Sequence, residues 1–155
     1  MKRRTILKGT LAMGVIGTGI SAGLLTPRSV LAAWPKSAFS ATSVGDALNA
    51  MYATDKRDSS SKIHLKAPDI AENGAVVQIT VSADMDHHVD AISIIAEKNV
   101  NPMAASFQLT EHSNPFVATR IKLGKTSNVI AVVKSNGKLY STQKEVKVTI
   151  GGCGG

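Results

Sequence analysis

The sequence is poor in the residues that would mark several classes of protein. It contains one cysteine in 155 residues, so no disulfide can form within the chain. Aromatic residues make up 4% of the chain, and no basic stripe with interleaved aromatics is present, which argues against a nucleic-acid-binding protein. The sequence also has no Ser/His/Asp order, no pair of carboxylates at a plausible spacing and no phosphate-binding loop. These absences give no support to a self-contained enzyme.

An export signal is indicated at the N-terminus. Arg3 and Arg4 form a twin-arginine pair, and a weakly apolar stretch interrupted by glycines follows from Leu11 to Leu25. This stretch is shorter than the roughly 20 apolar residues that a membrane span needs. We therefore expect residues 1–33 to be a signal peptide that directs the protein to the bacterial periplasm by the twin-arginine route. A retained N-terminal anchor is the alternative interpretation.

The positive charge of the chain is concentrated in this segment. Five of the eighteen basic residues and none of the eleven acidic residues lie within 1–33. The rest of the chain keeps thirteen basic residues, so its net charge is +2 instead of +7. About 122 residues remain, which suits one domain with a modest core.

Most of the remaining chain has the alternation of β-strands. The clean alternation from Ala75 to Ala83 predicts a half-buried strand. The unbroken apolar run Val129–Val133 predicts a strand buried on both faces, and Asn136-Gly137 predicts a two-residue hairpin. The other predicted strands are Val89–Ala96, Ala104–Thr110, Phe116–Leu123, Lys138–Tyr140 and a last one through Val146, Val148 and Ile150.

One helix is predicted before the strands, near residues 43–53. Ser43 is a plausible N-cap, and apolar residues follow it at helical spacing. Asp55–Ser61 is polar and predicts a loop. The number and spacing of the strands favour a mainly β fold for residues 34–150, an immunoglobulin-like antiparallel β-sandwich. A small open barrel is the alternative. Phe39, Met51 and Tyr52 could pack the helix onto the sandwich or onto a partner.

The single cysteine lies in the last five residues, Gly151-Gly152-Cys153-Gly154-Gly155. Glycine adds no bulk around the thiol, and terminal residues stay mobile unless they are held, so this segment predicts a flexible arm. An extended arm would carry the sulfur up to about 10 Å beyond Ile150. Such a tether suits a group carrier that offers its cargo to the active sites of other proteins. A flexible linker that happens to contain cysteine is the alternative.

This terminus carries a resemblance to a known family. Residues 144–150 followed by the glycine-flanked cysteine resemble the C-terminal signature of SoxY, the sulfur-carrier subunit of the periplasmic SoxYZ complex. Asn101-Pro102, the segment Thr119–Leu123 and the twin-arginine leader also resemble that family. Two residues depart from the usual leader: Lys2 stands where Ser or Thr is common, and Ile6 stands where Phe is usual.

The resemblance implies a carrier that is not an enzyme. Cys153 would hold thiosulfate or sulfide-derived sulfur covalently, and Gly151, Gly152, Gly154 and Gly155 would form the arm. It implies a SoxZ-like subunit as heterodimer partner, a c-type cytochrome that loads the arm, a sulfate-releasing hydrolase and, in some organisms, a sulfur dehydrogenase. It implies no cofactor, no metal, no nucleic acid and no membrane as partner. The alternative is a structural sandwich whose cysteine forms an intermolecular disulfide.

Two groups of polar residues carry weaker signals. Asp84, Asp86, His87 and His88 cluster between two predicted strands, where a solvated loop is favoured over a metal site because their spacing matches no ligand motif. His64 and His112 are isolated in the sequence and are expected on the surface or in loops.

The SoxZ-like partner is expected to cover an exposed apolar patch on one sheet face. The residues expected there are Val77, Ile79 and Val81, or Val117, Ile121 and Leu123.

Overall fold

The computed structural model describes residues 35–149. Two short helices come first, α2 (Lys36–Ser40) and α3 (Val44–Tyr52), and nine strands follow within these residues. No helix in this part of the chain is long and apolar enough to cross a membrane. The strands are β1 (Asp58–Ser59), β2 (Ile63–Lys66), β3 (Ile70–Ala71), β4 (Val77–Ala83), β5 (Val89–Ala96), β6 (Met103–Gln108), β7 (Phe116–Ile121), β8 (Ser127–Ser135) and β9 (Lys138–Val148).

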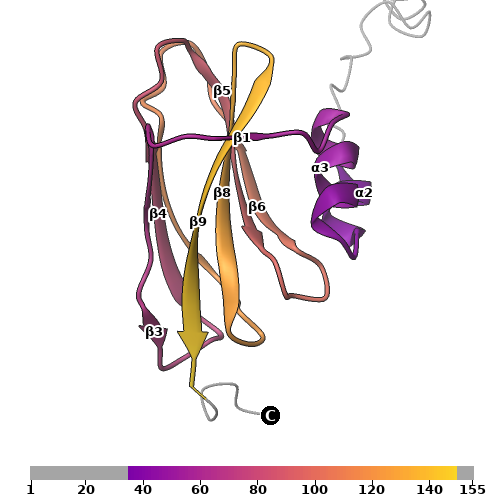
Figure 1. Cartoon of the computed structure of the whole chain (residues 1–155), viewed down its shortest axis with the longest axis vertical. Coiled ribbons are helices and arrows are strands. Elements are labelled where there is room, and N and C mark those ends of the chain that lie inside the picture. The colour runs from indigo at the N-terminus through magenta and orange to yellow at the C-terminus, as the bar shows by residue number, and fades with distance from the viewer. Residues whose placement is uncertain (1–34, 150–155) are drawn as a thin grey trace, which may run out of the picture. The chain divides into compact units, whose positions relative to one another are not determined.

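The strands form two sheets packed face to face, which confirms the predicted sandwich and excludes the barrel (Figure 1). The larger sheet has the order β1-β9-β8-β5-β6, with β3 also on β9, and the smaller has the order β2-β4-β7. A constant-type immunoglobulin domain keeps its fourth strand in the sheet of the first strand. Here β6, the fourth of the seven longer strands, pairs with β5 in the other sheet.

The two central strands of the larger sheet, β5 and β8, are buried on both faces. On its inner face, Ile92 and Ile94 of β5 pack with the alternate residues of β8 against the smaller sheet. On its outer face, Ile95 of β5 and Ile130 and Val132 of β8 form a second cluster with the helices. The prediction that Val129–Val133 is buried on both sides is therefore confirmed. The cause is a helical layer over an antiparallel sheet, as Figure 1 shows.

Helix α3 begins where the sequence predicts, and a second helix, α2, precedes it. The side-chain oxygen of Ser43 accepts a hydrogen bond from the amide of Asp46 at 3.0 Å, so Ser43 is the N-cap of α3. Phe39, Met51 and Tyr52 pack on the second cluster, so they join the helices to the sandwich. The prediction of a single helix missed α2, because five residues are too few to show helical periodicity.

Three strands were also missed, and one loop prediction is wrong. The polar stretch Asp55–Ser61 contains β1, which pairs in parallel with Tyr140 and Ser141 of β9. β3 pairs in parallel with the far end of the same strand. The sandwich is thus not wholly antiparallel. Strands of two to four residues show too little alternation to be recognised from sequence.

The predicted hairpin at Asn136-Gly137 is confirmed, since both residues have positive φ angles of 49° and 71°. It leads into β9, which is one continuous strand of eleven residues and not the two predicted segments. The polar residues in its middle do not interrupt it, because they pair with Val129–Val132 of β8.

The expected apolar patch for a partner is wrong. The six residues named for it are Val77, Ile79, Val81, Val117, Ile121 and Leu123, and each is exposed by 7% or less. They belong to the core cluster between the two sheets. Alternate positions on β4 and β7 face β5 and β8, so the alternation that suggested a binding face is the signature of the core.

A buried hydroxyl network joins α3 to the larger sheet. Ser93 on β5 is completely buried, and its hydroxyl lies 2.6 Å from the hydroxyl of Tyr52. The Ser93 hydroxyl donates to Ser106 on β6 at 2.8 Å, so the Tyr52 hydroxyl donates to Ser93. The buried Ser93 hydroxyl thereby has both a hydrogen-bond donor and a hydrogen-bond acceptor as partners.

We predict that Tyr52→Phe lowers the free energy of unfolding by about 1 kcal/mol, because it removes this donor from a buried acceptor. Tyr140→Phe is the matched control, since no hydrogen bond of the Tyr140 hydroxyl occurs within residues 35–149. Urea denaturation of both variants measures the difference. Equal losses in the two variants would contradict a stabilising role for the Tyr52–Ser93 contact.

Candidate functional site

The predicted site residues lie at the two ends of the sequence. Arg3, Arg4, Cys153 and the four glycines around it are all outside the described residues, 35–149, so their roles remain predictions. The structure shows instead how the chain is held up to Thr149, four residues before Cys153. The candidate site is therefore approached from the end of β9.

The end of β9 is held on both of its edges. The amides of Lys147 and Thr149 donate to the carbonyl oxygens of Asp69 and Ala71 at 2.9 and 3.2 Å. On the other edge, the amide of Val148 donates to the hydroxyl of Thr126 at 3.0 Å. Strand β3 and its flanking residues bind the first edge of β9, and Thr126 binds the second. The backbone is fixed as far as Thr149.

This support sets the reach of the predicted arm. Four residues separate Thr149 from Cys153, and an extended chain advances at most about 3.6 Å per residue. The thiol can lie no further than roughly 14 Å from the last fixed residue. A protein that acts on Cys153 must therefore come close to the end of the sandwich where β9 ends.

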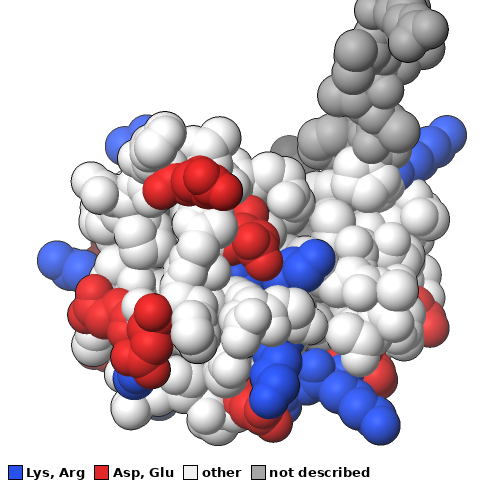
Figure 2. Space-filling model, turned by 90° about the horizontal axis from the view of Figure 1, so that it is seen from above, with Lys and Arg blue, Asp and Glu red and all other residues white. Residues whose placement is uncertain are grey.

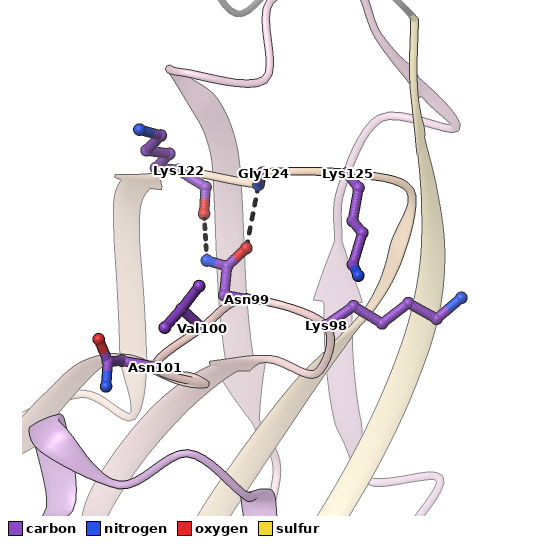
Figure 3. A pocket seen from close by; sticks show the side chains of 7 residues that line it. All are labelled: Lys98, Asn99, Val100, Asn101, Lys122, Gly124 and Lys125. Carbon is purple, nitrogen blue, oxygen red and sulfur yellow. Dashed lines mark hydrogen bonds between the residues drawn. The ribbon is translucent and has the colours of Figure 1, made fainter.

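Three connecting segments meet at that end. They are residues 69–76, 97–101 and 122–126, and together with residues 147–149 we call them the β9-end surface. Asn99 joins two of them, since its side chain donates to the carbonyl of Lys122 at 2.7 Å and accepts from the amide of Gly124 at 3.0 Å (Figure 3). The amide of Leu123 donates to the carbonyl of Gly74 at 2.7 Å, which joins the third.

A cationic pocket of about 560 Å³ opens in this surface (Figure 3). It is lined by Lys98, Asn99, Val100, Asn101, Lys122, Gly124 and Lys125, and no carboxylate is among them. None of its three lysines forms an ion pair within the part of the chain that the structure describes. Sequence analysis named Lys122 and Asn101 only within the family resemblance. It missed Lys98 and Lys125, because Lys98 lies in a different loop from Lys122 and Lys125, and the sequence shows no pattern that joins the two loops.

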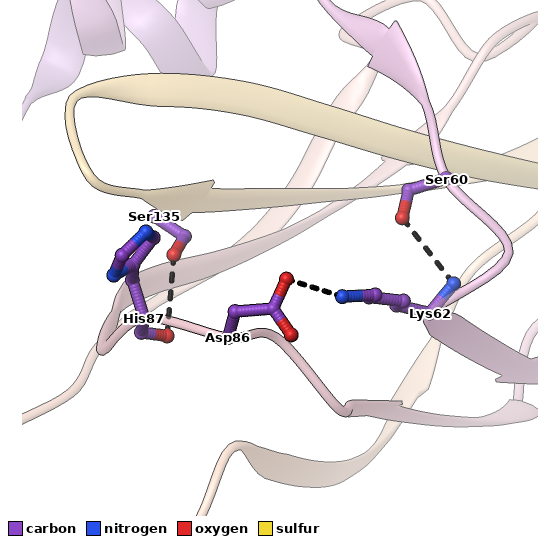
Figure 4. A network of polar contacts seen from close by, with 5 residues as sticks. All are labelled: Ser60, Lys62, Asp86, His87 and Ser135. Carbon is purple, nitrogen blue, oxygen red and sulfur yellow. Dashed lines mark hydrogen bonds and ion pairs between the residues drawn. The ribbon is translucent and has the colours of Figure 1, made fainter.

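The Asp84–His88 cluster lies at the end of the sandwich opposite to the β9-end surface. Figure 2 views the molecule from that opposite end. His64 is not isolated: it is an exposed residue of β2, and its Nε2 lies 3.2 Å from Asp84. Asp86 forms an ion pair with Lys62, while the Ser135 hydroxyl donates to the His87 carbonyl at 3.3 Å (Figure 4). Within residues 35–149, no three histidine, aspartate, glutamate or cysteine residues are grouped to hold a metal. These contacts attach the β4–β5 connection to neighbouring strands.

The Lys62–Asp86 contact lowers the pKa of Asp86, first through the hydrogen bond from the ammonium group and then through its charge. A carboxylate with a lowered pKa stabilises the fold while it is charged, so this contribution is lost as the pH falls through that pKa. We predict that Lys62→Met raises the pKa of Asp86 towards its ordinary value. Carboxyl-carbon NMR titration measures this pKa, with Lys66→Met on β2, the strand that follows Lys62, as the control. An unchanged Asp86 titration in Lys62→Met would contradict the contact.

Comparison with solved structures gives a close relative. The sulfur carrier protein SoxY from Chlorobium limicola f thiosulfatophilum is 42% identical, and the match covers 68% of this chain and 94% of that chain with a TM-score of 0.61. A superoxide reductase (neelaredoxin) from Ignicoccus hospitalis is 22% identical over 57% of this chain and 80% of that chain. Its TM-score of 0.51 indicates a shared fold only. A search of curated proteins found no match.

A family model for the sulfur oxidation protein SoxY matches residues 48–153. The match runs from α3 through every strand of the sandwich, and it ends at the cysteine. It includes all three segments of the β9-end surface. This extent, together with the identity to a solved SoxY over most of the domain, shows that the chain belongs to the SoxY family of sulfur oxidation proteins.

Proposed function

We propose that this protein carries sulfur compounds covalently on Cys153 and presents them to the enzymes of a sulfur-oxidising system. The observation that carries the proposal is the family match, which ends at the only cysteine of the chain. A 42% identical relative is a sulfur carrier protein. The fixed end of β9 supports the same proposal, because the hydrogen bonds there would give a tether that follows Thr149 a rigid base.

The proposed loading step is an oxidative coupling. The Cys153 thiolate and thiosulfate form a sulfur–sulfur bond, which gives a cysteine thiosulfonate, and the thiol releases its proton. Two electrons leave the pair of sulfur atoms, and we propose that a c-type cytochrome accepts them. The product is an anion at the end of the arm. Sulfide-derived sulfur would be held on the same atom as a persulfide, and the c-type cytochrome would likewise accept the two electrons released when that bond forms.

The proposed unloading step is a hydrolysis. Water attacks the terminal sulfonate sulfur, the bond to the neighbouring sulfur breaks, and sulfate leaves while a persulfide remains on Cys153. A sulfate-releasing hydrolase supplies the activation of water. Where a sulfur dehydrogenase is present, it oxidises the outer persulfide sulfur to a sulfonate with the oxygen of three water molecules, and the six electrons pass to a c-type cytochrome. The same hydrolase then releases this sulfonate as a second sulfate, which returns the Cys153 thiol. In this cycle the carrier supplies the attachment atom and the partner enzymes supply the catalysis.

The setting of this cycle is also proposed. The twin-arginine pair Arg3-Arg4 supports export of residues after the signal peptide 1–33 to the periplasm. A SoxZ-like subunit is the proposed constant partner. The face that it covers is not the one expected from sequence, because those residues form the core.

Intact-protein mass spectrometry of the chain from sulfur-grown cells tests the proposal. We predict mass increments of thiosulfonate, sulfonate or persulfide in the absence of reductant, and their loss after reduction. Cys153→Ser is the control and should carry none of them, because the chain has no other thiol. An unmodified thiol, or only a disulfide-linked dimer, would instead support the structural sandwich with an intermolecular disulfide.

The glycines beside the cysteine give a second prediction. If the arm enters a narrow channel, Gly152→Val and Gly154→Val should slow sulfate release about tenfold to a hundredfold, because bulk beside the thiol displaces it from the reacting position. Gly152→Ala and Gly154→Ala are the matched controls with the smallest added side chain. Chemical loading of Cys153, followed by mass, checks that the thiol still reacts. Normal turnover of both valine variants would contradict a channel role.

A further inference from the structure

The β9-end surface carries most of the exposed apolar residues of the described chain. Four large hydrophobic residues within residues 35–149 are strongly exposed, and three of them, Ile70, Val76 and Val100, lie in its segments at 57%, 54% and 82%. The fourth, Phe116, begins β7 at the other end of the sandwich. Exposed apolar residues that gather at one end of a small domain indicate a contact surface.

The same surface presents lysines that have no ion-pair partner among residues 35–149. Lys98, Lys122 and Lys125 line one pocket from two loops, and their side chains extend in different directions, while Asn99 ties the two loops together through its two hydrogen bonds (Figure 3). The two loops that line the pocket are therefore already held together, and no loop has to become ordered before the pocket forms.

Carboxylates of the neighbourhood are engaged or lie outside the pocket. Asp69 pairs with Lys144 at 3.0 Å, and Glu97 accepts a hydrogen bond from Asn128 at 2.9 Å. Glu72 is exposed on the β3 side and does not line the pocket. At the opposite end of the sandwich, Asp86 neutralises Lys62, whereas Lys138 forms no ion pair within residues 35–149.

We propose that the β9-end surface is the docking surface for the enzymes that act on Cys153, and that these enzymes present a carboxylate-bearing rim with an apolar edge to it. The inference rests on the proposed function, and it names the surface and the chemistry of the partner. The reach of the arm requires such a contact, because a thiol held within roughly 14 Å of Thr149 enters a recessed site only if the rim of that site meets the body of the carrier. The unpaired lysines supply steering and the exposed apolar residues supply contact area.

The test uses full-length mature carrier loaded at Cys153 with tetrathionate. The thiolate displaces thiosulfate from that reagent, which leaves the cysteine thiosulfonate. The sulfate-releasing hydrolase of the same system is the probe, and sulfate release is measured against carrier concentration. The variant is the triple reversal Lys98→Glu, Lys122→Glu and Lys125→Glu. The matched control reverses three other lysines that form no ion pair within residues 35–149, namely Lys36, Lys56 and Lys138.

We expect the triple variant to raise KM for the loaded carrier about tenfold with kcat unchanged, and the control to behave as wild type. Added salt should raise KM of the wild type and affect the variant less, since the attraction is screened. Val100→Ser should raise KM without a change in salt dependence. All positions are exposed, and thermal unfolding checks that each variant is folded.

Two other outcomes would contradict either the docking surface or the proposed function, and they can be told apart. A triple variant with wild-type KM, or one that loses kcat alone, overturns the docking surface, because the lysines then do not recruit the enzyme. If the loaded wild-type carrier releases no sulfate while a SoxY of known activity does, the proposed function fails and not the docking surface alone.

Discussion

Strands β5 and β8 lie between two apolar layers, and the rest of the structure is arranged around that position. Their inner faces pack on the smaller sheet and their outer faces on α2 and α3. Burying one such isoleucine or valine side chain stabilises the fold by about 1.5–3 kcal/mol relative to leaving it exposed. A strand with apolar side chains on both faces is stable only if both faces are covered, so the fold needs the helices to cover the outer faces of β5 and β8. A shift of one residue in pairing would exchange the two clusters, which fixes the register.

The position of β5 and β8 at the centre also determines where β9 lies in the larger sheet. The strand follows β8 through a tight hairpin and so becomes the edge of the larger sheet, where unpaired backbone groups are a liability. Two short parallel strands, β1 and β3, cover its two ends. Between them, Lys144 donates to the carbonyl of Ala67 at 2.6 Å. An edge that is covered up to its last residues becomes a firm base for the segment that follows it.

The proposed carrier role places different physical demands on the body of the protein and on its C-terminal segment. A carrier must place its attachment atom repeatedly in recessed sites, which favours small residues around the cysteine. It must also be recognised, which favours a rigid surface whose charges and apolar residues keep fixed positions. In this protein the loops that surround the end of β9 meet the second demand, because backbone and side-chain hydrogen bonds tie them to one another.

The sequence alone determined the features that local patterns record. Alternation identified the longer strands, Asn136-Gly137 identified the hairpin, Ser43 identified the start of α3, and the terminal cysteine motif indicated the family. Only the tertiary structure decided which apolar face is core, that β9 is one strand, and that β1 and β3 cover it in parallel. It alone placed Lys98 beside the loop that carries Lys122 and Lys125, so that all three line one pocket. Alternation shows that a face is apolar but not what covers it, and pairing between distant segments leaves no local pattern.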